Sequence, residues 1–193
     1  MRQELRRQLK TKRMQISVSE KMVAAEATAK HILAHLPQTG GYIAGYWASN
    51  GEVPLHILQL RLPENWIWCL PIVQANRELL FAPWHAGDEL VTNQYGIPEP
   101  TLTSTSCLKP EEISVAVIPL LGFTRLGQRL GMGGGYYDRS FSFRKNQFAS
   151  PQLIGIAYAC QEIDALDTQT WDINMDAIAT ENEWINCNAE DKP

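Results

Sequence analysis

The sequence predicts one α/β domain, in which helices flank a largely parallel central sheet. Short, mostly apolar runs of strand length alternate along the chain with stretches of helical periodicity, which is typical of a parallel sheet buried on both faces. The 193 residues include 45% hydrophobic and 20% charged side chains, an ordinary composition for a globular protein. Because no repeat, low-complexity tract or Pro/Ser-rich linker divides the chain, we expect residues 1–193 to form a single domain.

Two helices are expected before the first strand. Leu5 and Leu9 recur at i, i+4 within residues 1–14, while basic side chains follow another face of the same helix. These basic residues are Arg2, Arg6, Lys10 and Arg13. Ser17-Val-Ser-Glu20 is a capping-box pattern that opens a second helix. The apolar stripe of that helix comprises Met22, Ala25, Ala29, Ile32, Leu33 and Leu36, and the helix is expected to end between Pro37 and Gly41.

Strand-like segments dominate the rest of the chain. Residues 42–48 predict a short buried strand, followed by a turn at 49–51 and a third helix that begins at Glu52-Val-Pro54. Further strands are expected at 66–73, 79–84, 115–123, 153–159 and 176–185. The run at 79–84 follows its predecessor so closely that we expect an antiparallel hairpin there. We expect the C-terminal tail, 187–193, to be disordered.

Charge and cysteine content argue against several classes of protein. The net charge of −4, from 17 basic and 21 acidic residues, argues against nucleic-acid binding. No apolar run approaches the roughly 18 residues of a membrane span, and the basic N-terminal segment lacks the apolar centre of a secretory signal. The 4 cysteines lie far apart in the sequence and lack the spacing of metal ligands. We therefore expect them to be free thiols in a reducing compartment. We therefore expect a cytoplasmic monomer without a nucleic-acid or membrane partner.

The basic residues are concentrated at the N-terminus. Residues 1–13 contain six arginines and lysines and one acid, Glu4, whereas the remaining 180 residues contain 11 bases and 20 acids. A cationic stripe on an acidic protein favours a polyanionic ligand such as a nucleotide phosphate. The alternative is a solvated helix face, the usual place of a charge run.

The segment from Ile118 to Arg139 is the most informative part of the sequence. Six of the 13 glycines lie between Gly122 and Gly135, after the run at 115–123 and before a stretch that can form a helix. A parallel sheet binds its ligands beyond the carboxyl ends of its strands. Successive glycines can turn backbone N–H groups inward around an anion, so the segment favours a phosphate site.

Arginines support this interpretation, since Arg125 and Arg129 can donate bidentate hydrogen bonds to phosphate. The segment is not a Walker A loop, because no Lys-Ser/Thr pair follows the glycines. It is not a dinucleotide-binding loop either, because Tyr136 stands where the third glycine is required. A tight turn or a mobile surface loop remains the alternative to a phosphate site.

The glycine-rich motif resembles that of a known family. Gly127-Gln-Arg-Leu-Gly-Met-Gly-Gly-Gly-Tyr-Tyr-Asp-Arg139, preceded by Pro119-Leu-Leu-Gly-Phe123, closely resembles the signature of 5-formyltetrahydrofolate cyclo-ligases. The resemblance extends over nearly the whole chain: it includes the basic N-terminal helix, Asn50-Gly-Glu52, Tyr95-Gly-Ile-Pro-Glu-Pro100, and Trp171-Asp172 leading to Ala179-Thr-Glu181. It implies a Rossmann-like layered sheet and the reaction of ATP with 5-formyltetrahydrofolate to 5,10-methenyltetrahydrofolate, ADP and phosphate, with Mg²⁺.

The resemblance also implies an ATP site. The family uses a Lys-x-x-x-Arg pair on its first helix, which corresponds here to Arg2 and Arg6, so that an arginine replaces the lysine. The loop that wraps the triphosphate corresponds to Arg129, Gly131, Met132, Gly133, Gly134, Gly135, Tyr136 and Tyr137. The expected catalytic residues are Arg6 and Arg129, which would neutralise the transferred phosphoryl group, and Tyr137, which would donate a hydrogen bond to the formyl or phosphoryl oxygen.

A folate site and a metal site follow from the same resemblance. Glu52 is expected to accept hydrogen bonds from the pterin, and aromatic side chains suit its flat ring: these are Tyr46, Trp47, Tyr95 and Tyr136. Asp138 is the first choice for a Mg²⁺ contact and Asp172 the second, because Mg²⁺ favours carboxylate and phosphate oxygens. The implied reaction phosphorylates the formyl oxygen before N10 attacks, and it needs no protein nucleophile.

Other functions are weighed beside this one. A sugar-phosphate isomerase or CoA transferase on a similar sheet would need a carboxylate or lysine general base beside a phosphate loop. A non-catalytic relative would bind folate, nucleotide or RNA without turnover. His31 and His35 form an i, i+4 pair without a metal-site motif, and we expect them to be structural or at the surface.

Overall fold

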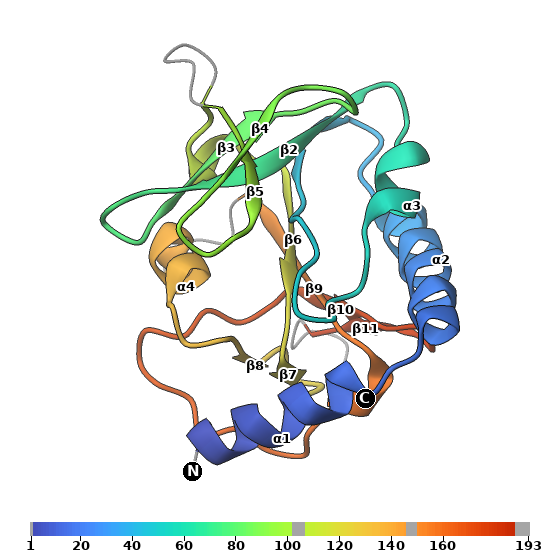
Figure 1. Cartoon of the computed structure of the whole chain (residues 1–193), viewed down its shortest axis with the longest axis vertical. Helices are drawn as coiled ribbons and strands as arrows, with labels where there is room; N and C mark the ends of the chain where they lie inside the picture. Colours follow the sequence, from blue (N-terminus) through green and yellow to red (C-terminus); the bar gives the residue numbers. More distant parts are fainter. Residues whose placement is uncertain (1, 102–106, 146–149, 188–193) are drawn as a thin grey trace.

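A seven-stranded sheet forms the centre of the molecule (Figure 1). The computed structural model describes residues 2–101, 107–145 and 150–187. The strands of this sheet are, in spatial order, β11 (Trp184–Asn186), β10 (Ala177–Ala179), β9 (Gln152–Ile156), β6 (Val115–Pro119), β1 (Gly41–Ala44), β2 (Trp66–Val73) and β3 (Leu79–Pro83). The five inner strands are parallel and the two edge strands antiparallel. This confirms the predicted α/β fold with a largely parallel sheet, including the hairpin of β2 and β3.

The two faces of the sheet bury separate hydrophobic cores. Val115 and Val117 of β6 pack into one core, and Ala116 and Ile118 pack into the other. All four side chains are at most 1% exposed. Because successive side chains of a strand point to opposite faces, a strand buried on both faces is a continuous apolar run, which is why the sequence pattern was informative.

Helices cover both faces (Figure 1). α2 (Val18–His35) and α3 (His56–Leu60) lie on one side, and α4 (Tyr136–Ser140) lies on the other. α2 begins at the predicted capping box, where the Ser17 hydroxyl accepts a hydrogen bond from the Glu20 N–H at 3.3 Å. The short 3₁₀ helices are η1 (Pro110–Glu112), η2 (Ser142–Lys145) and η3 (Ala159–Gln161). No helix within the described residues has the length and apolar character that crossing a membrane requires.

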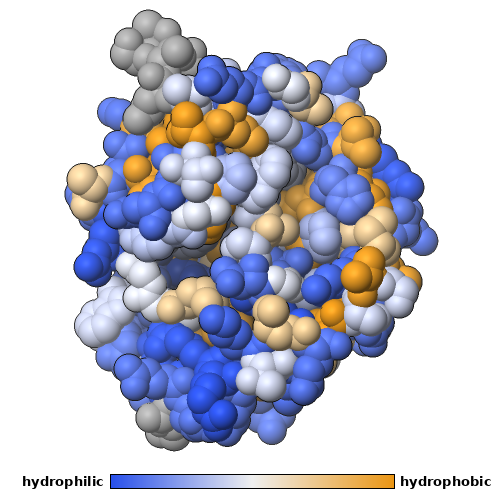
Figure 2. Space-filling model, viewed as in Figure 1, coloured by the Kyte–Doolittle hydropathy of each residue, from blue (hydrophilic) through white to orange (hydrophobic). Residues whose placement is uncertain are grey.

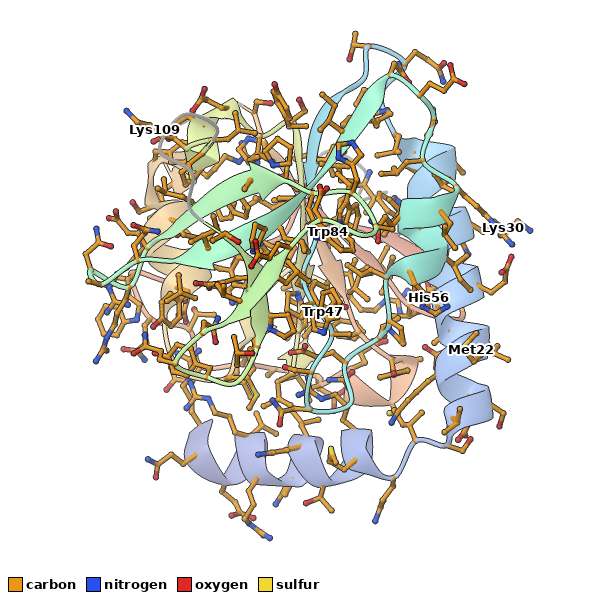
Figure 3. All side chains as sticks on the ribbon, turned by 45° about the horizontal axis from the view of Figure 1, so that its top comes forward. Met22, Lys30, Trp47, His56, Trp84 and Lys109 are labelled. Carbon is orange, nitrogen blue, oxygen red and sulfur yellow. The ribbon has the colours of Figure 1, made fainter. Side chains whose placement is uncertain are left out.

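The apolar stripe predicted for α2 is wrong at Met22. Ala25, Ala29, Ile32 and Leu36 are buried and Leu33 is partly buried, whereas Met22 is 45% exposed and points away from the sheet (Figure 3). The contact face is instead centred on small side chains that include Ala24 and Thr28, so its direction was not set by the large apolar residues alone.

Several apolar runs contain a turn that the sequence did not reveal. The run at 115–123 divides into β6 and β7 (Gly122–Phe123), which pairs with β8 (Arg129–Leu130) outside the main sheet. Leu120 and Leu121, at the division, are 2% and 1% exposed. A turn whose side chains stay buried is as apolar as a strand, so the two cannot be distinguished by periodicity.

Other boundaries shift in a similar way. The run at 176–185 is the hairpin of β10 and β11, and the strand expected over 42–48 ends at Ala44. The third helix begins at His56 because residues 49–52 form a turn, in which the Glu52 carboxylate accepts the Ser49 N–H at 2.9 Å. The disorder expected for the tail at 187–193 concerns residues outside the described ranges, apart from Cys187.

The position of the site follows from the strand order. The chain adds β2 on one side of β1 and later returns to place β6 on its other side, so the loops after β1 and β6 diverge and open a crevice at the edge of the sheet. α1 (Arg2–Met14) crosses this edge (Figure 1). Its Leu9 packs against Leu121 and Leu130. The basic helix expected over residues 1–14 therefore lies beside the glycine-rich segment.

A second small sheet borders the same crevice. β4 (Leu90–Thr92) and β5 (Pro98–Pro100) form an antiparallel hairpin. Its Glu99 carboxylate accepts hydrogen bonds from the Val73 N–H at 3.2 Å and the Asn93 side chain at 3.0 Å. The first bond attaches the hairpin to β2, and the second stabilises the turn of the hairpin.

Candidate active site

A cavity of about 710 Å³ occupies the crevice, and the surface is hollowed between the β4–β5 hairpin and α1 (Figure 2). Its lining comes from α1, the loop after β1, strands β2 and β3, the β4–β5 hairpin, the glycine-rich segment and residues 169–172. Every residue that the family resemblance predicted for the site lines it: Arg2, Arg6, Tyr46, Trp47, Glu52, Tyr95, Arg129, Gly131, Met132, Gly133, Gly134, Gly135, Tyr136, Tyr137, Asp138 and Asp172. The fold thus brings the predicted residues together, while their individual roles stay predictions.

Two arginines of α1 line the cavity one helical turn apart. Arg2 Nη1 lies 2.9 Å from Asp172 Oδ2, and Arg6 Nε donates to the Gly131 carbonyl at 2.9 Å. Burial lowers the pKa of the Arg6 guanidinium, and the charge of Arg2 lowers it further. The Arg6 guanidinium nevertheless stays charged at neutral pH, so an anion in the cavity would relieve its repulsion from Arg2.

The glycines of the segment are required by the backbone. Gly133 and Gly135 have φ of +101° and +71°, a region that favours glycine. A Cβ on Gly134 would lie 2.9 Å from the Tyr136 ring, and one on Gly135 would lie 2.8 Å from Arg139 Nη1. The backbone can therefore approach a ligand more closely here than a segment with side chains would allow.

Arg129 is the buried cation of this wall. It is 6% exposed and forms an ion pair with Asp138, whose Oδ1 also accepts the Ile173 N–H at 3.2 Å. The Nε atoms of Arg129 and Arg2 are buried without a hydrogen-bond partner in the described part of the chain. A buried unsatisfied donor costs about 1–3 kcal/mol, so these atoms favour a ligand that brings acceptor oxygens.

Asp138 and Asp172 fit a metal ion only in part. Each carboxylate uses one oxygen for its arginine and a backbone N–H, and the other oxygen of each has no hydrogen bond within the described ranges. The residues described include no group of three or more His, Cys, Asp or Glu side chains placed to hold a metal. Mg²⁺ is commonly held by one or two carboxylates together with substrate phosphates and water. This donor set therefore suits a metal that arrives with a nucleotide.

Glu52 lies on the opposite wall, in the turn after β1. Its side chain is 12% exposed, and it accepts the Ser49 N–H at 2.9 Å and the Ser49 hydroxyl at 3.4 Å. Burial raises the pKa of Glu52, while the Ser49 N–H and the charge of Arg13 oppose that shift. The turn thus presents a largely buried carboxylate to the cavity, where it can accept hydrogen bonds from a ligand.

Aromatic side chains flank Glu52. Tyr46 is 6% exposed and donates its hydroxyl proton to the Val53 carbonyl at 2.7 Å, so its ring forms a fixed wall. Trp47 is 40% exposed, and its ring meets that of Trp84 edge to face at 5.9 Å (Figure 3). A flat apolar ring can pack against this surface.

Three tyrosines line the cavity on the side of α4 and the β4–β5 hairpin. Tyr95 and Tyr136 are joined by a hydroxyl–hydroxyl hydrogen bond, and their rings meet edge to face at 5.8 Å. This contact ties the hairpin to α4 across the cavity. Burial raises the pKa of Tyr137, so this side chain stays an un-ionised phenol that can donate a hydrogen bond.

Two arginines are placed differently from the sequence-based interpretation. Arg125 does not line the cavity; it forms exposed ion pairs with Glu162 at 3.2 Å and Glu183 at 2.6 Å, so its suggested phosphate contact is wrong. Arg13 is 1% exposed and lies 3.9 Å from Glu52, although it was expected only on the basic face of α1. Its burial depends on contacts with segments more than 30 positions away, for which the sequence carries no local signal.

The histidine pair is structural, as expected. His31 Nδ1 lies 3.1 Å from the Thr180 carbonyl oxygen, and His35 stacks on Trp184 at 4.1 Å. Within the described residues, no histidine or lysine lines the cavity. A general base of either kind is therefore missing there.

Known proteins match both the sequence and the fold. The model of the 5-formyltetrahydrofolate cyclo-ligase family matches residues 1–181. A 5-formyltetrahydrofolate cyclo-ligase of Haemophilus influenzae is 31% identical over 178 residues, which cover 90% of this chain and 94% of the relative. The match thus spans almost the full length of both proteins.

Two solved structures share the fold. The NMR structure of Aquifex aeolicus 5,10-methenyltetrahydrofolate synthetase superposes with a TM-score of 0.81 at 27% identity, covering 100% of this chain and 95% of the other. A 5,10-methenyltetrahydrofolate synthetase from Mycoplasma pneumoniae superposes with a TM-score of 0.72 at 28% identity, covering 97% of this chain and 99% of the other. Together with the matched family model, which includes the glycine-rich segment and both arginines of α1, these likenesses show that the chain belongs to the 5-formyltetrahydrofolate cyclo-ligase family.

Proposed function

We propose that the cavity binds ATP between α1 and the glycine-rich segment and binds the folate against Tyr46, Trp47 and Glu52. The activity itself is that of the family: ATP-dependent conversion of 5-formyltetrahydrofolate by a cyclo-ligase. One observation carries the assignment of the two halves. A single cavity has a cationic, glycine-rich wall and a separate wall with aromatic rings and a carboxylate, which suit a triphosphate and a reduced pterin respectively.

The chemical task is to make the formyl oxygen a leaving group. In the proposed sequence this oxygen attacks the γ-phosphorus, the bond from phosphorus to the bridging oxygen breaks, and ADP leaves. N10 then attacks the activated formyl carbon and loses its proton, and the carbon–oxygen bond breaks with release of phosphate. The protein supplies orientation and charge stabilisation rather than a nucleophile.

The roles of individual residues follow from their positions. Arg129 and Arg6 would neutralise the oxygens of the transferred phosphoryl group. The buried Nε–H of Arg129 has no hydrogen-bond partner among the described residues, so it could donate to one of these oxygens. Tyr137, as a neutral phenol, would donate a hydrogen bond to the formyl or phosphoryl oxygen. Arg2 would contact the outer phosphates beside Arg6, with Asp172 holding its guanidinium in place.

Asp138 is the proposed Mg²⁺ contact and Asp172 the alternative, each through the carboxylate oxygen that its arginine does not occupy. The ion would neutralise charge on the phosphates when bound.

The chain is also proposed to act as a cytoplasmic monomer; its four free cysteines support a reducing compartment.

Absorbance in the methenylfolate band tests the proposal. Purified protein mixed with ATP, Mg²⁺ and 5-formyltetrahydrofolate should produce the band, and omission of ATP should abolish it. ATP hydrolysis that does not depend on the folate would contradict the proposed function. The family model that matches residues 1–181 argues against the sugar-phosphate and CoA alternatives.

Gly133→Ala tests the nucleotide half of the site. The φ of +101° makes alanine unfavourable by about 1–2 kcal/mol, and relief of this strain would move backbone N–H groups away from the phosphates. We expect the KM for ATP to rise about tenfold, measured by steady-state kinetics. Gly87→Ala is a matched control, since Gly87 has φ of +105° and open space around it; equal kinetic effects of both variants would remove Gly133 from the site.

A further inference from the structure

Arg13 joins three segments that build the cavity. On the last turn of α1, its side chain is 1% exposed. Its Nε donates to the Asn50 carbonyl at 3.0 Å, its Nη1 donates to the Leu120 carbonyl at 3.4 Å, and its Nη2 lies 3.9 Å from the sulfur of Met132. One guanidinium group therefore contacts the turn after β1, the end of β6 and the glycine-rich segment.

The same group stands beside Glu52. Arg13 Nη1 is 3.9 Å from Glu52 Oε1, while Oε2 accepts the Ser49 N–H. Both carboxylate oxygens thus have a neighbour that favours the ionised form. Taking a guanidinium out of water costs several kcal/mol, and an apolar side chain could fill the space without that cost. That a charged side chain is buried here despite this cost favours an electrostatic role of Arg13 toward Glu52.

We propose that Arg13 is a positioning residue for the folate half of the site: its guanidinium group holds the Glu52 carboxylate ionised and in place. The inference rests on the proposed contact between Glu52 and the folate. A planar guanidinium can reach several acceptors in fixed directions, which an ammonium group cannot do. Through Asn50 and Met132, Arg13 also ties the folate wall to the nucleotide loop.

The electrostatic role has a definite sign. Burial raises the pKa of Glu52, and Arg13 is the cation that opposes this shift among the described groups that act on it. The other titratable groups that face Glu52 are Tyr46, Tyr137 and Tyr158. Burial raises the pKa of all three phenols, so they stay neutral as Glu52 titrates. Without Arg13, Glu52 would become protonated, and lose its negative charge, at a higher pH.

The test is the pH dependence of kcat/KM for 5-formyltetrahydrofolate. In Arg13→Gln we expect the acid limb to move upward by about one pH unit and the KM for 5-formyltetrahydrofolate to rise about tenfold or more. Arg13→Lys keeps the charge, so its acid limb should stay near that of the wild type while its KM rises less. Rescue of the limb by lysine distinguishes a charge effect from a packing effect.

Arg144→Gln is the matched control. Arg144 is another largely buried arginine, with a side chain 9% exposed and an ion pair to Asp176 at 2.7 Å, and neither residue lines the cavity. The substitution should lower the melting temperature without moving the acid limb. A folded Arg13→Gln protein with wild-type KM and acid limb would overturn the inference, as would an equal shift in Arg144→Gln. If Arg13→Gln does not fold, an acid limb that moves upward by about one pH unit in Arg13→Lys overturns it, because lysine keeps the charge.

A measurement without substrate separates this inference from the proposed function. A carboxyl group whose pKa is higher in the folded than in the unfolded state makes stability fall as pH rises between those two values. Glu52→Gln should therefore reduce the fall in melting temperature between about pH 4 and 7, and this reduction should be larger in the Arg13→Gln background than in the wild type. Equal reductions in the two backgrounds would contradict the electrostatic role even in an active enzyme, whereas an inactive wild type with the expected difference would contradict only the proposed function.

Discussion

Replacing Arg129 by glutamine is expected to lower kcat for methenylfolate formation by about 100-fold or more. Arg129 is largely buried beside Asp138 in the glycine-rich wall, where low solvent access strengthens its interaction with developing phosphoryl charge. Glutamine keeps a hydrogen-bond donor but not the charge. A 100-fold loss corresponds to about 2.7 kcal/mol of transition-state stabilisation, which steady-state kinetics at saturating ATP would measure.

Two comparisons make this prediction specific. Arg125→Gln removes an exposed arginine from the same segment that lies outside the cavity and should leave kcat unchanged. Arg129→Gln also leaves the Asp138 carboxylate without its partner, which lowers stability. The double variant Arg129→Gln/Asp138→Asn should recover melting temperature but not kcat. A folded Arg129→Gln protein with wild-type kcat would exclude Arg129 from phosphoryl transfer.

Glu52→Gln is expected to raise the KM for 5-formyltetrahydrofolate by about 10- to 100-fold and to leave the KM for ATP unchanged. The two side chains are nearly isosteric, so the change removes a charged acceptor while the turn at residues 49–52 keeps its shape. Hydrogen bonds to a charged group contribute about 1.5–3 kcal/mol, and about 1.4 kcal/mol corresponds to a tenfold change in affinity. Initial rates with each substrate varied in turn would measure both constants.

Glu183→Gln is the control for this second variant, because Glu183 is an exposed carboxylate paired with Arg125 away from the cavity. It should change neither KM. An equal rise of both KM values in Glu52→Gln would indicate that the turn or the sheet edge is disturbed, and would contradict a role confined to the folate.

Sequence patterns succeeded where the physical cause was local. Ser17 and Glu20 predicted the start of α2 because a capping box acts within one helical turn. The apolar run at 66–73 predicted β2 because a strand buried on both faces needs such a run. The glycines at 133 and 135 marked a backbone with positive φ, which few other residues adopt.

Patterns failed where the cause was a contact with a distant segment. Leu120 and Leu121 belong to an apolar run, but the chain turns there so that Gly122 and Phe123 can pair with β8. Met22 continues an apolar stripe, but the sheet packs against the neighbouring small residues. In both places the local pattern permitted two arrangements, and packing decided between them.

The same distinction applies to the site. By itself the sequence determined the family and the fold class, and it named every charged residue that lines the cavity in the described part of the chain, because the glycine-rich motif and the basic helix carry local constraints. Only the tertiary structure decided which arginines serve the cavity: Arg125 pairs with Glu183 at the surface, whereas Arg13 is buried beside Glu52. The environment of a charged side chain is set by what packs over it, and that depends on segments far apart along the chain.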